Sequence, residues 1–210
     1  MIWVVADGVG GSDHGGLASK CIARFLLQVP RPKSLDDHIE KTMHSLRKAN
    51  DLFRRQEKTK GTTAASTVVA LLIHDNTGAC LWAGDSRCYL FRDGILYQCT
   101  KDHTLRQEKI DKGELTAPEA RRMVRGNIIT NAVGVHDNLR TEEVRFTVHA
   151  GDRFLLCSDG LSNSISPEAI TAYLNTDTAT EAVENMTKAL NDMDQLDNIT
   201  FVAIFISKPI

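Results

Sequence analysis

The chain opens on the stretch Ile2-Trp-Val-Val-Ala-Asp-Gly-Val-Gly-Gly11, an apolar run that leads straight into a glycine-rich loop. The apolar run predicts a buried strand, and Asp7 carries the only charge in the stretch. A carboxylate at the end of a rigid strand is well placed to bind a metal ion, and glycines let the backbone approach that ion closely. A single Asp-Gly pair is more often a turn, so the meaning of Asp7 depends on whether similar carboxylates recur.

Three further aspartates lie next to apolar segments. They are Asp85 after Leu81-Trp-Ala-Gly84, Asp159 after Phe154-Leu-Leu-Cys-Ser158, and Asp197 just before the last apolar segment. Glycine follows both Asp7 and Asp159, so the carbonyls of Gly8 and Gly160 have no side chain in the way. Carboxylate, carbonyl and water oxygens are the ligands that Mg²⁺ and Mn²⁺ prefer. Each Asp-Gly pair alone favours a turn, but the four aspartates together predict a metal site.

The helical patterns lie at the two ends of the chain. Residues 17–29 predict a helix that ends at Pro30, and Ser34 is the expected N-cap of a second, longer helix with one apolar stripe. Pro167 marks the start of a further helical pattern, which runs with one break to about Asn191. The helices are therefore expected to be segregated from the strands.

The rest of the chain has strand character. Strands are expected over residues 67–73, 80–83, 88–91, 95–99, 141–148, 153–157 and 199–206. The first four form an antiparallel meander in this interpretation, with a hairpin turn at Asp93-Gly94. Residues 101–126 are polar and predict a surface excursion of short helix and loop. The order of elements predicts an α+β fold with two packed, mainly antiparallel sheets flanked by helices, and one domain over residues 1–210.

The composition excludes several classes of partner. With 42% hydrophobic and 25% charged residues, the chain is typical of a globular protein, and its net charge of −2 offers no basic surface for nucleic acid. No apolar run approaches the roughly 20 residues that span a bilayer, so no membrane partner is expected. The five cysteines are scattered without C-x-x-C spacing. This pattern predicts free, buried thiols in a reducing compartment, and hence a cytoplasmic protein.

A series of motifs gives the pattern a specific family resemblance. They are Val5-Ala-Asp-Gly-Val-Gly-Gly11, Gly61-Thr-Thr-Ala-Ala-Ser-Thr67, Trp82-Ala-Gly-Asp-Ser-Arg87 with Tyr89 and Arg92-Asp-Gly94, Thr100-Lys-Asp-His103, Asn127-Ile-Ile-Thr130 with Ala132-Val-Gly134, Gly151-Asp-Arg-Phe-Leu-Leu-Cys-Ser-Asp-Gly-Leu161 and Asp197-Asn-Ile-Thr200. Because these motifs occur in this order, the chain resembles the metal-dependent protein serine/threonine phosphatases of the PP2C type, in their compact bacterial form. The resemblance covers essentially the whole chain and implies the PP2C-like α-β-β-α sandwich.

The resemblance also implies roles for the aspartates. Asp7 would bridge two Mn²⁺ or Mg²⁺ ions, with the carbonyl of Gly8 on one of them. Asp159 and Asp197 would hold the other ion, which makes Asp7, Asp159 and Asp197 the catalytic carboxylates. Asp85, with Asp159, would bind a third and weaker ion. Ser158 and Asn198 are implied as orienting residues, and Asn131 stands where the family more often has arginine.

The implied reaction is hydrolysis of phosphoserine and phosphothreonine on proteins, and the implied substrates are those of a cognate Ser/Thr kinase. Two divalent ions roughly 3.5–4 Å apart activate a shared water for in-line attack on phosphorus. Some family members carry a histidine as general acid at the position of Val9, so another proton donor is needed here. Residues 105–126 match the family's mobile flap. Its charged residues, which are Arg106, Glu108, Lys109, Arg121, Arg122 and Arg125, either contact substrate or form a solvated surface.

The chain departs from the family at its start. A strand that normally precedes Asp7, with a phosphate-binding arginine and a Glu-Asp pair, has no counterpart before Met1. A truncated sequence and a natural short form both account for this. Loss of the arginine would weaken phosphate binding, because a bidentate guanidinium contact is hard to replace.

Two functions of different classes therefore remain after the sequence analysis. The four aspartates favour an enzyme, whereas the missing arginine and Glu-Asp pair favour a catalytically weak phosphatase-like module that acts through partner binding. A third interpretation, in which the glycines form a nucleotide-binding loop, fits the sequence poorly. In the G-x-G-x-x-G register that starts at Gly8, Asp13 stands where glycine is required, and it would repel a pyrophosphate.

Overall fold

Two antiparallel four-stranded sheets pack face to face in the computed structural model, which describes residues 1–9, 13–124, 128–193 and 197–207. The first sheet has the order β1 (Ile2–Val5), β2 (Val68–His74), β3 (Thr77–Ala83) and β6 (Glu142–Thr147). The second has the order β5 (Ile95–Gln98), β4 (Arg87–Arg92), β7 (Arg153–Cys157) and β8 (Phe201–Phe205). The α+β fold with two packed antiparallel sheets is confirmed.

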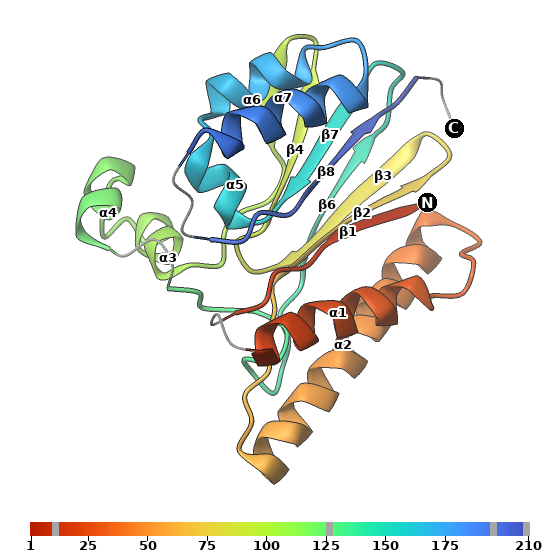
Figure 1. The fold of residues 1–210 in the computed structure, drawn as a ribbon. Coiled ribbons are helices and arrows are strands. Elements are labelled where there is room, and N and C mark those ends of the chain that lie inside the picture. Colours follow the sequence, from red (N-terminus) through yellow and green to blue (C-terminus); the bar gives the residue numbers. More distant parts are fainter. Residues whose placement is uncertain (10–12, 125–127, 194–196, 208–210) are drawn as a thin grey trace.

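Helices cover both outer faces of this sandwich (Figure 1). The first sheet is covered by α1 (Asp13–Leu27) and α2 (Leu35–Lys60), and the second by α6 (Pro167–Leu174) and α7 (Ala179–Asn191). A short helix, α5 (Asp159–Ser164), follows β7, while α3 (Leu105–Asp111) and α4 (Ala117–Met123) project at the end opposite the chain termini. The predicted N-cap of α2 is confirmed, because the Ser34 hydroxyl accepts the Asp37 N–H at 3.2 Å.

The single meander predicted over residues 67–99 is wrong. It consists of two hairpins in different sheets, β2–β3 and β4–β5, and the chain crosses between the sheets at residues 84–86. Gly84 makes this crossing with φ 128°, and a Cβ there would lie 2.5 Å from the Cβ of Thr67. Only glycine fits such a position. The crossing places Asp85 at the end of the sandwich, between the two sheets.

Smaller differences concern the ends of elements. α1 begins at Asp13 rather than at residue 17 and ends at Leu27, before the expected boundary, and α5 was not predicted. The hairpin turn at Asp93-Gly94 is confirmed, with φ values of 51° and 79° that suit a tight hairpin. Gly10 and Gly11 of the opening motif, Arg125 and Gly126 of the flap, and Asn127 lie outside the described residues.

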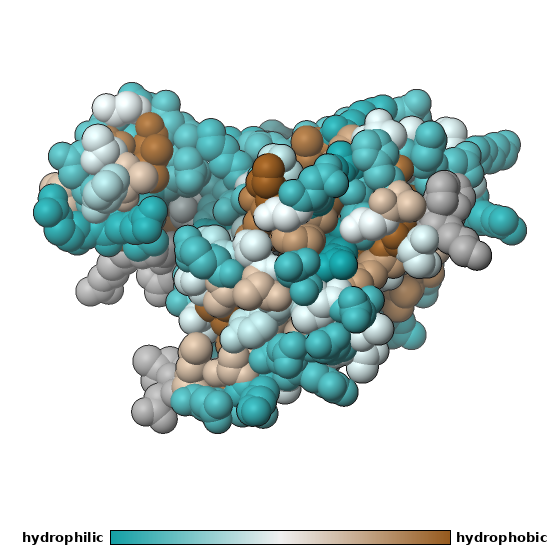
Figure 2. Space-filling view, turned by 90° about the horizontal axis from the view of Figure 1, so that it is seen from above, coloured by the Kyte–Doolittle hydropathy of each residue, from teal (hydrophilic) through white to brown (hydrophobic). Residues whose placement is uncertain are grey.

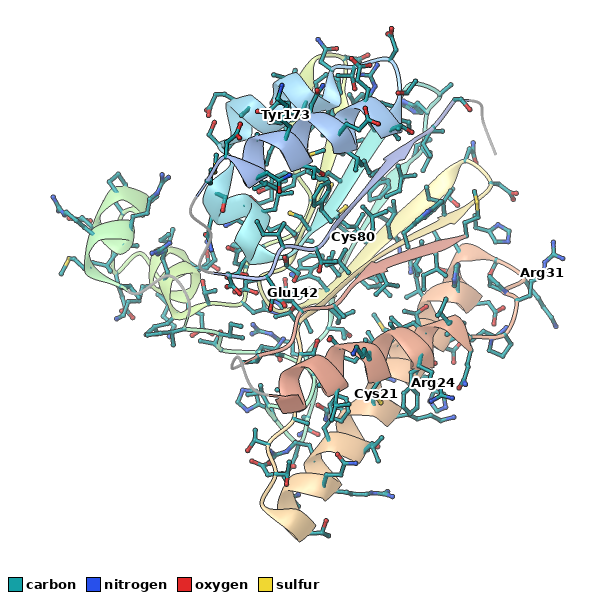
Figure 3. All side chains as sticks on the ribbon, in the orientation of Figure 1. Cys21, Arg24, Arg31, Cys80, Glu142 and Tyr173 are labelled. Carbon is teal, nitrogen blue, oxygen red and sulfur yellow. The ribbon has the colours of Figure 1, made fainter. Side chains whose placement is uncertain are left out.

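The main core lies between the two sheets. Its fully buried members include Leu71 and Cys80 from the first sheet and Cys88, Phe154 and Leu156 from the second. Figure 3 shows Cys80 at the centre of this layer. All five cysteines are free thiols; Cys80, Cys88 and Cys157 are buried as predicted, whereas Cys21 and Cys99 are only half-buried.

The outer surface is mostly hydrophilic in the view of Figure 2, with apolar groups scattered over it. In the part of the chain that the structure describes, no helix has the length and apolar character needed to cross a membrane.

The inter-sheet core predicts a clear contrast between two leucines. Leu156 has 0% of its surface exposed and Leu27 has 81%. We expect Leu156→Ala to lower the free energy of unfolding by about 2–5 kcal/mol, because the deletion leaves a cavity in a close-packed core. Leu27→Ala removes the same atoms from a solvated position and should have little effect. Urea denaturation of both variants checks this, and equal losses would contradict the assignment of the core.

Candidate metal centre

Asp7 leaves the end of β1 on a short ladder to residues 65–67. The Thr67 N–H donates to the Asp7 carbonyl at 2.8 Å, and the Val9 N–H donates to the Ala65 carbonyl at 2.9 Å. In this antiparallel pattern the N–H and C=O of Gly8 point away from the ladder. The Gly8 carbonyl is therefore available to a ligand. A side chain at Gly8 is impossible, because its Cβ would lie 2.3 Å from the backbone of Gly15 in α1.

Thr67 links Asp7 to Ser86, the residue that follows Asp85. The Thr67 hydroxyl accepts the Asp7 N–H at 3.3 Å and lies 2.7 Å from the hydroxyl of Ser86. Asp85 itself is buried, with 6% of its surface exposed. Two sheets that pack face to face thus bring carboxylates 78 positions apart in the sequence to the same end of the molecule.

Asp159 and Asp197 come together through Ser158. The Ser158 N–H donates to the Thr200 carbonyl at 2.9 Å, and the Ser158 hydroxyl accepts the Thr200 N–H at 3.1 Å. Ser158 is buried and is the N-cap of α5, so Asp159 is the first residue of a helix rather than part of a loop. This geometry supports the orienting role proposed for Ser158.

The Gly160 carbonyl differs from the sequence expectation. It accepts the Ser164 hydroxyl at 2.7 Å within α5, and Gly160 is buried. The structure therefore gives no support to Gly160 as a metal ligand and leaves Gly8 as the backbone candidate.

Burial and neighbouring carboxylates raise the pKa values of Asp7, Asp85 and Asp159, which indicates one shared electrostatic site. Burial, and then the charges of Asp159 and Asp197, raise the pKa of Asp7 to about 6. Burial is also the main cause of the raised pKa of Asp85, about 7, with further contributions from Asp159, Asp102 and Asp7. The pKa of Asp159 is raised by burial and by Asp197. Repulsion of this kind is what a bound divalent cation relieves.

The donor chemistry of this cluster fits Mn²⁺ or Mg²⁺, which prefer carboxylate and carbonyl oxygens. Among the described side chains, however, no three His, Cys, Asp or Glu groups converge closely enough to form a ready-made ligand set. The structure thus brings the four aspartates into one acidic neighbourhood but does not place their oxygens at ligand distances.

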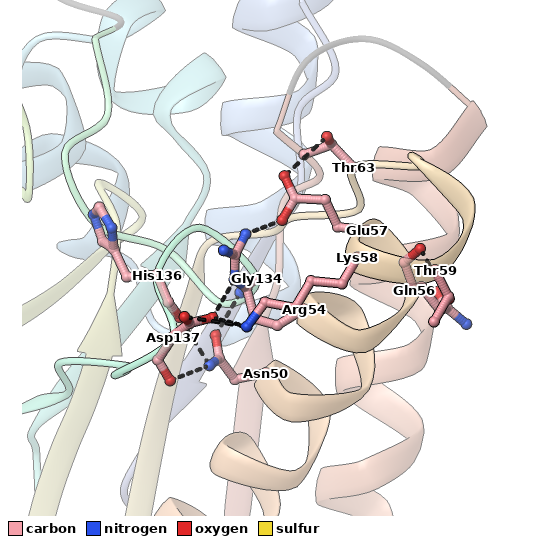
Figure 4. Close-up of polar contacts among 10 residues, drawn as sticks. All are labelled: Asn50, Arg54, Gln56, Glu57, Lys58, Thr59, Thr63, Gly134, His136 and Asp137. Atoms are coloured by element: carbon pink, nitrogen blue, oxygen red, sulfur yellow. Dashed lines mark hydrogen bonds and ion pairs between the residues drawn. The ribbon is translucent and has the colours of Figure 1, made fainter.

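A polar clamp between α2 and residues 134–137 was not expected from the sequence. The side chain of Asn50, 1% exposed on α2, donates to the carbonyls of His136 and Asp137 and accepts the Gly134 N–H at 2.7 Å (Figure 4). Arg54 and Lys58 add ion pairs to the Asp137 carboxylate.

This polar clamp is connected to Gly8 through main-chain bridges. Val133 pairs with Ser66, and Ser66 pairs with Gly8. The clamped turn therefore supports the peptide that carries the candidate backbone ligand. A lone asparagine in an amphipathic helix gives no sequence signal for such a contact.

Asn131 has a defined structural role. Its buried amide lies 2.8 Å from His103 Nδ1 and donates to the Arg140 carbonyl at 2.8 Å. Asn131 thus joins the start of β6 to the segment that precedes the flap.

The flap is built from the predicted polar segment. Thr104 caps α3 by accepting the Gln107 N–H at 3.3 Å, and Lys109 pairs with Glu114 at 2.9 Å inside the flap. Arg106 donates to the Val124 carbonyl at 3.1 Å. Two of the charged residues expected on the flap are therefore used, at least in part, to hold it together.

The comparisons with known proteins agree with this architecture. A sequence profile described as Protein phosphatase 2C matches residues 1–195. The serine/threonine protein phosphatase PstP of Mycobacterium tuberculosis is 32% identical over 200 residues, which cover 94% of this chain and 39% of PstP. The chain therefore spans well under half the length of that relative. It belongs to the protein phosphatase 2C family.

Solved structures give the same picture. PppA, described as a key regulatory component of T6SS in Pseudomonas aeruginosa, superposes with a TM-score of 0.89 at 33% identity, over 97% of this chain and 85% of PppA. The catalytic domain of PstP in complex with two manganese ions superposes with a TM-score of 0.84 at 31% identity, over 96% of this chain and 86% of that domain. The α-β-β-α sandwich expected from the sequence is thereby confirmed.

The raised pKa of Asp85 predicts an unusual pH dependence. A carboxyl whose folded-state pKa lies near 7 destabilises the metal-free protein as pH rises from about 4 through 7. We expect metal-free Asp85→Asn to be more stable than the wild type at pH 8, by about 1–4 kcal/mol, with the difference vanishing near pH 4. Chemical denaturation in EDTA across this pH range measures it. A gap that does not change with pH would contradict the assigned environment of Asp85.

Proposed function

We propose that this chain hydrolyses phosphoserine and phosphothreonine on proteins and requires Mn²⁺ or Mg²⁺ to do so. The observation that carries the proposal is the acidic cluster of Asp7, Asp85, Asp159 and Asp197 at one end of the sandwich, in a chain whose relative PstP is a serine/threonine protein phosphatase. The PstP complex with two manganese ions supports the choice of metal.

The residue roles follow from chemistry and position. Asp7 and the Gly8 carbonyl would hold the two principal ions, together with Asp159 and Asp197, and Asp85 would complete a third, weaker site with Asp159. When bound, such ions activate a water molecule as nucleophile and neutralise charge on the phosphoryl oxygens. Thr67 and Ser158 would orient the carboxylates through the hydrogen bonds described above. Val9 has no proton to transfer to the leaving group.

The partners would be phosphorylated proteins, including those modified by a cognate Ser/Thr kinase. The five free thiols support a reducing, cytoplasmic setting. Exposed arginines of α4, Arg121 and Arg122, lie on the flap in a position to contact an acidic phosphoprotein.

Loss of one proposed metal ligand should strongly reduce the phosphatase activity. We expect Asp159→Asn to lower kcat/KM for a phosphothreonine peptide and for an aryl phosphate, both with Mn²⁺, by about 100-fold or more. The reason is that losing a ligand exceeds the 10–100-fold effects usual for groups that only support ligands. Phosphate release assays provide the measurement.

Asp177→Asn is the matched control, since Asp177 is exposed in the turn between α6 and α7. Its activity should equal that of the wild type. A wild-type protein that binds Mn²⁺ but hydrolyses neither substrate would instead support the partner-binding module.

A further inference from the structure

Asp85 sits in a crossing that belongs to neither sheet. Gly84 and Asp85 lie between the end of β3 and the start of β4, so no strand ladder holds them. The neighbouring carboxylates Asp7 and Asp159 carry the same charge, which tends to push Asp85 away. Something else must hold the crossing in place.

Residues 102 and 103 fasten the crossing on both sides of Asp85. On one side, the His103 N–H donates to the Gly84 carbonyl at 2.8 Å, and the Gly84 N–H donates to His103 Nδ1 at 3.1 Å. On the other side, Arg87 Nε and Nη2 donate to the two carboxylate oxygens of Asp102 at 2.8 and 2.6 Å. We call these contacts of Gly84, Arg87, Asp102 and His103 the crossing clamp.

The Arg87–Asp102 part of the clamp is a strong contact. It is bidentate and charge-assisted, and the side chains are only 24% and 15% exposed. Arg87 Nη1 also donates to the Tyr89 hydroxyl at 3.0 Å, so the guanidinium has one orientation. Arg87 is paired with Cys157 in the ladder, two residues before Asp159. Arg87 is therefore two residues from Asp85 in the sequence, and its ladder partner Cys157 is two residues from Asp159.

The side chain of His103 contributes to the clamp through one ring nitrogen. The ring is 3% exposed, and the backbone N–H of Gly84 makes Nδ1 an acceptor, so the proton of the neutral ring resides on Nε2. Nε2 lies 3.1 Å from Glu142 Oε1 but is not aligned for a hydrogen bond. Figure 3 shows Glu142 at this end of the sandwich, beside the flap. The side chain of His103 thus acts on the crossing through Nδ1, in addition to the bond from its backbone N–H to the Gly84 carbonyl.

We infer that Arg87, Asp102 and His103 are positioning residues for Asp85, and that the crossing clamp sets the affinity of the metal site that Asp85 completes. The inference rests on the proposed metal-dependent function. Because Asp102 and His103 directly precede Thr104, the N-cap of α3, the segment that positions Asp85 is also the root of the flap. Residues that orient a ligand without touching the metal are a recognised determinant of metal affinity.

The chain contains a matched control for this test. Arg92 and Asp152 form the same kind of bidentate pair at the opposite end of β4, with both contacts at 2.6 Å. We expect Arg87→Gln to raise the Mn²⁺ dissociation constant of the weakest site about 10-fold. Arg92→Gln should lower stability without changing Mn²⁺ binding. Titration with Mn²⁺, counting unbound ions by their electron paramagnetic resonance signal, measures binding without turnover.

His103 allows a test by conservative rescue. His103→Asn places an amide oxygen near the position of Nδ1 and keeps an acceptor for the Gly84 N–H, whereas His103→Leu removes it. Weak-site Mn²⁺ binding should be retained better in His103→Asn than in His103→Leu. In aryl phosphate assays the clamp variants should need more Mn²⁺ for half-maximal rate while kcat at saturating Mn²⁺ recovers.

The outcomes separate the two proposals. If the wild type binds Mn²⁺ and Arg87→Gln binds it as Arg92→Gln does, the inference is wrong and the proposed function stands. If the wild type binds no Mn²⁺, both are overturned. If Arg87→Gln does not fold, Asp102→Asn replaces it, since the amide is isosteric and keeps one acceptor for Arg87.

Discussion

The packing of two sheets against each other holds four carboxylates at one end of the sandwich against their mutual repulsion. The inter-sheet core, with Leu71, Phe154 and Leu156 fully buried, sets the distance between the strands that deliver Asp7, Asp85 and Asp159. Burial of this apolar surface is favourable. Burying carboxylates and gathering them at one place is not, and both effects raise the pKa values of Asp7 and Asp85. The site therefore depends on stability generated elsewhere in the fold.

The segments around the acidic cluster are irregular, and each is held by specific polar contacts. Thr67 joins the Asp7 strand to the crossing, Asn50 fixes the turn that supports Gly8, and Ser158 joins Asp159 to the last strand. Buried groups of this kind are costly unless every partner is present. They give the loops definite positions that strand ladders do not provide.

Much of the fold follows from local patterns in the chain. Alternating and continuous apolar runs predicted all but the exact ends of the strands, Ser34 predicted the start of α2, and Asp93-Gly94 predicted a hairpin. The division of residues 67–99 between two sheets was not predictable, because a strand's apolar pattern does not reveal its neighbour. The short helix that begins at Asp159 was missed for a different reason, because six residues carry too little periodicity to indicate a helix.

The sequence alone named Asp7, Asp85, Asp159 and Asp197 as candidate metal ligands, because the identity and spacing of aspartates and glycines are local properties. It also indicated the family, through motifs that keep their order along the chain. Packing in three dimensions was needed to bring Asp7, Asp85 and Asp159 into one electrostatic site and to fasten the crossing through Asp102 and His103. These are contacts between distant segments, and they exist only once apolar burial has brought the two sheets together.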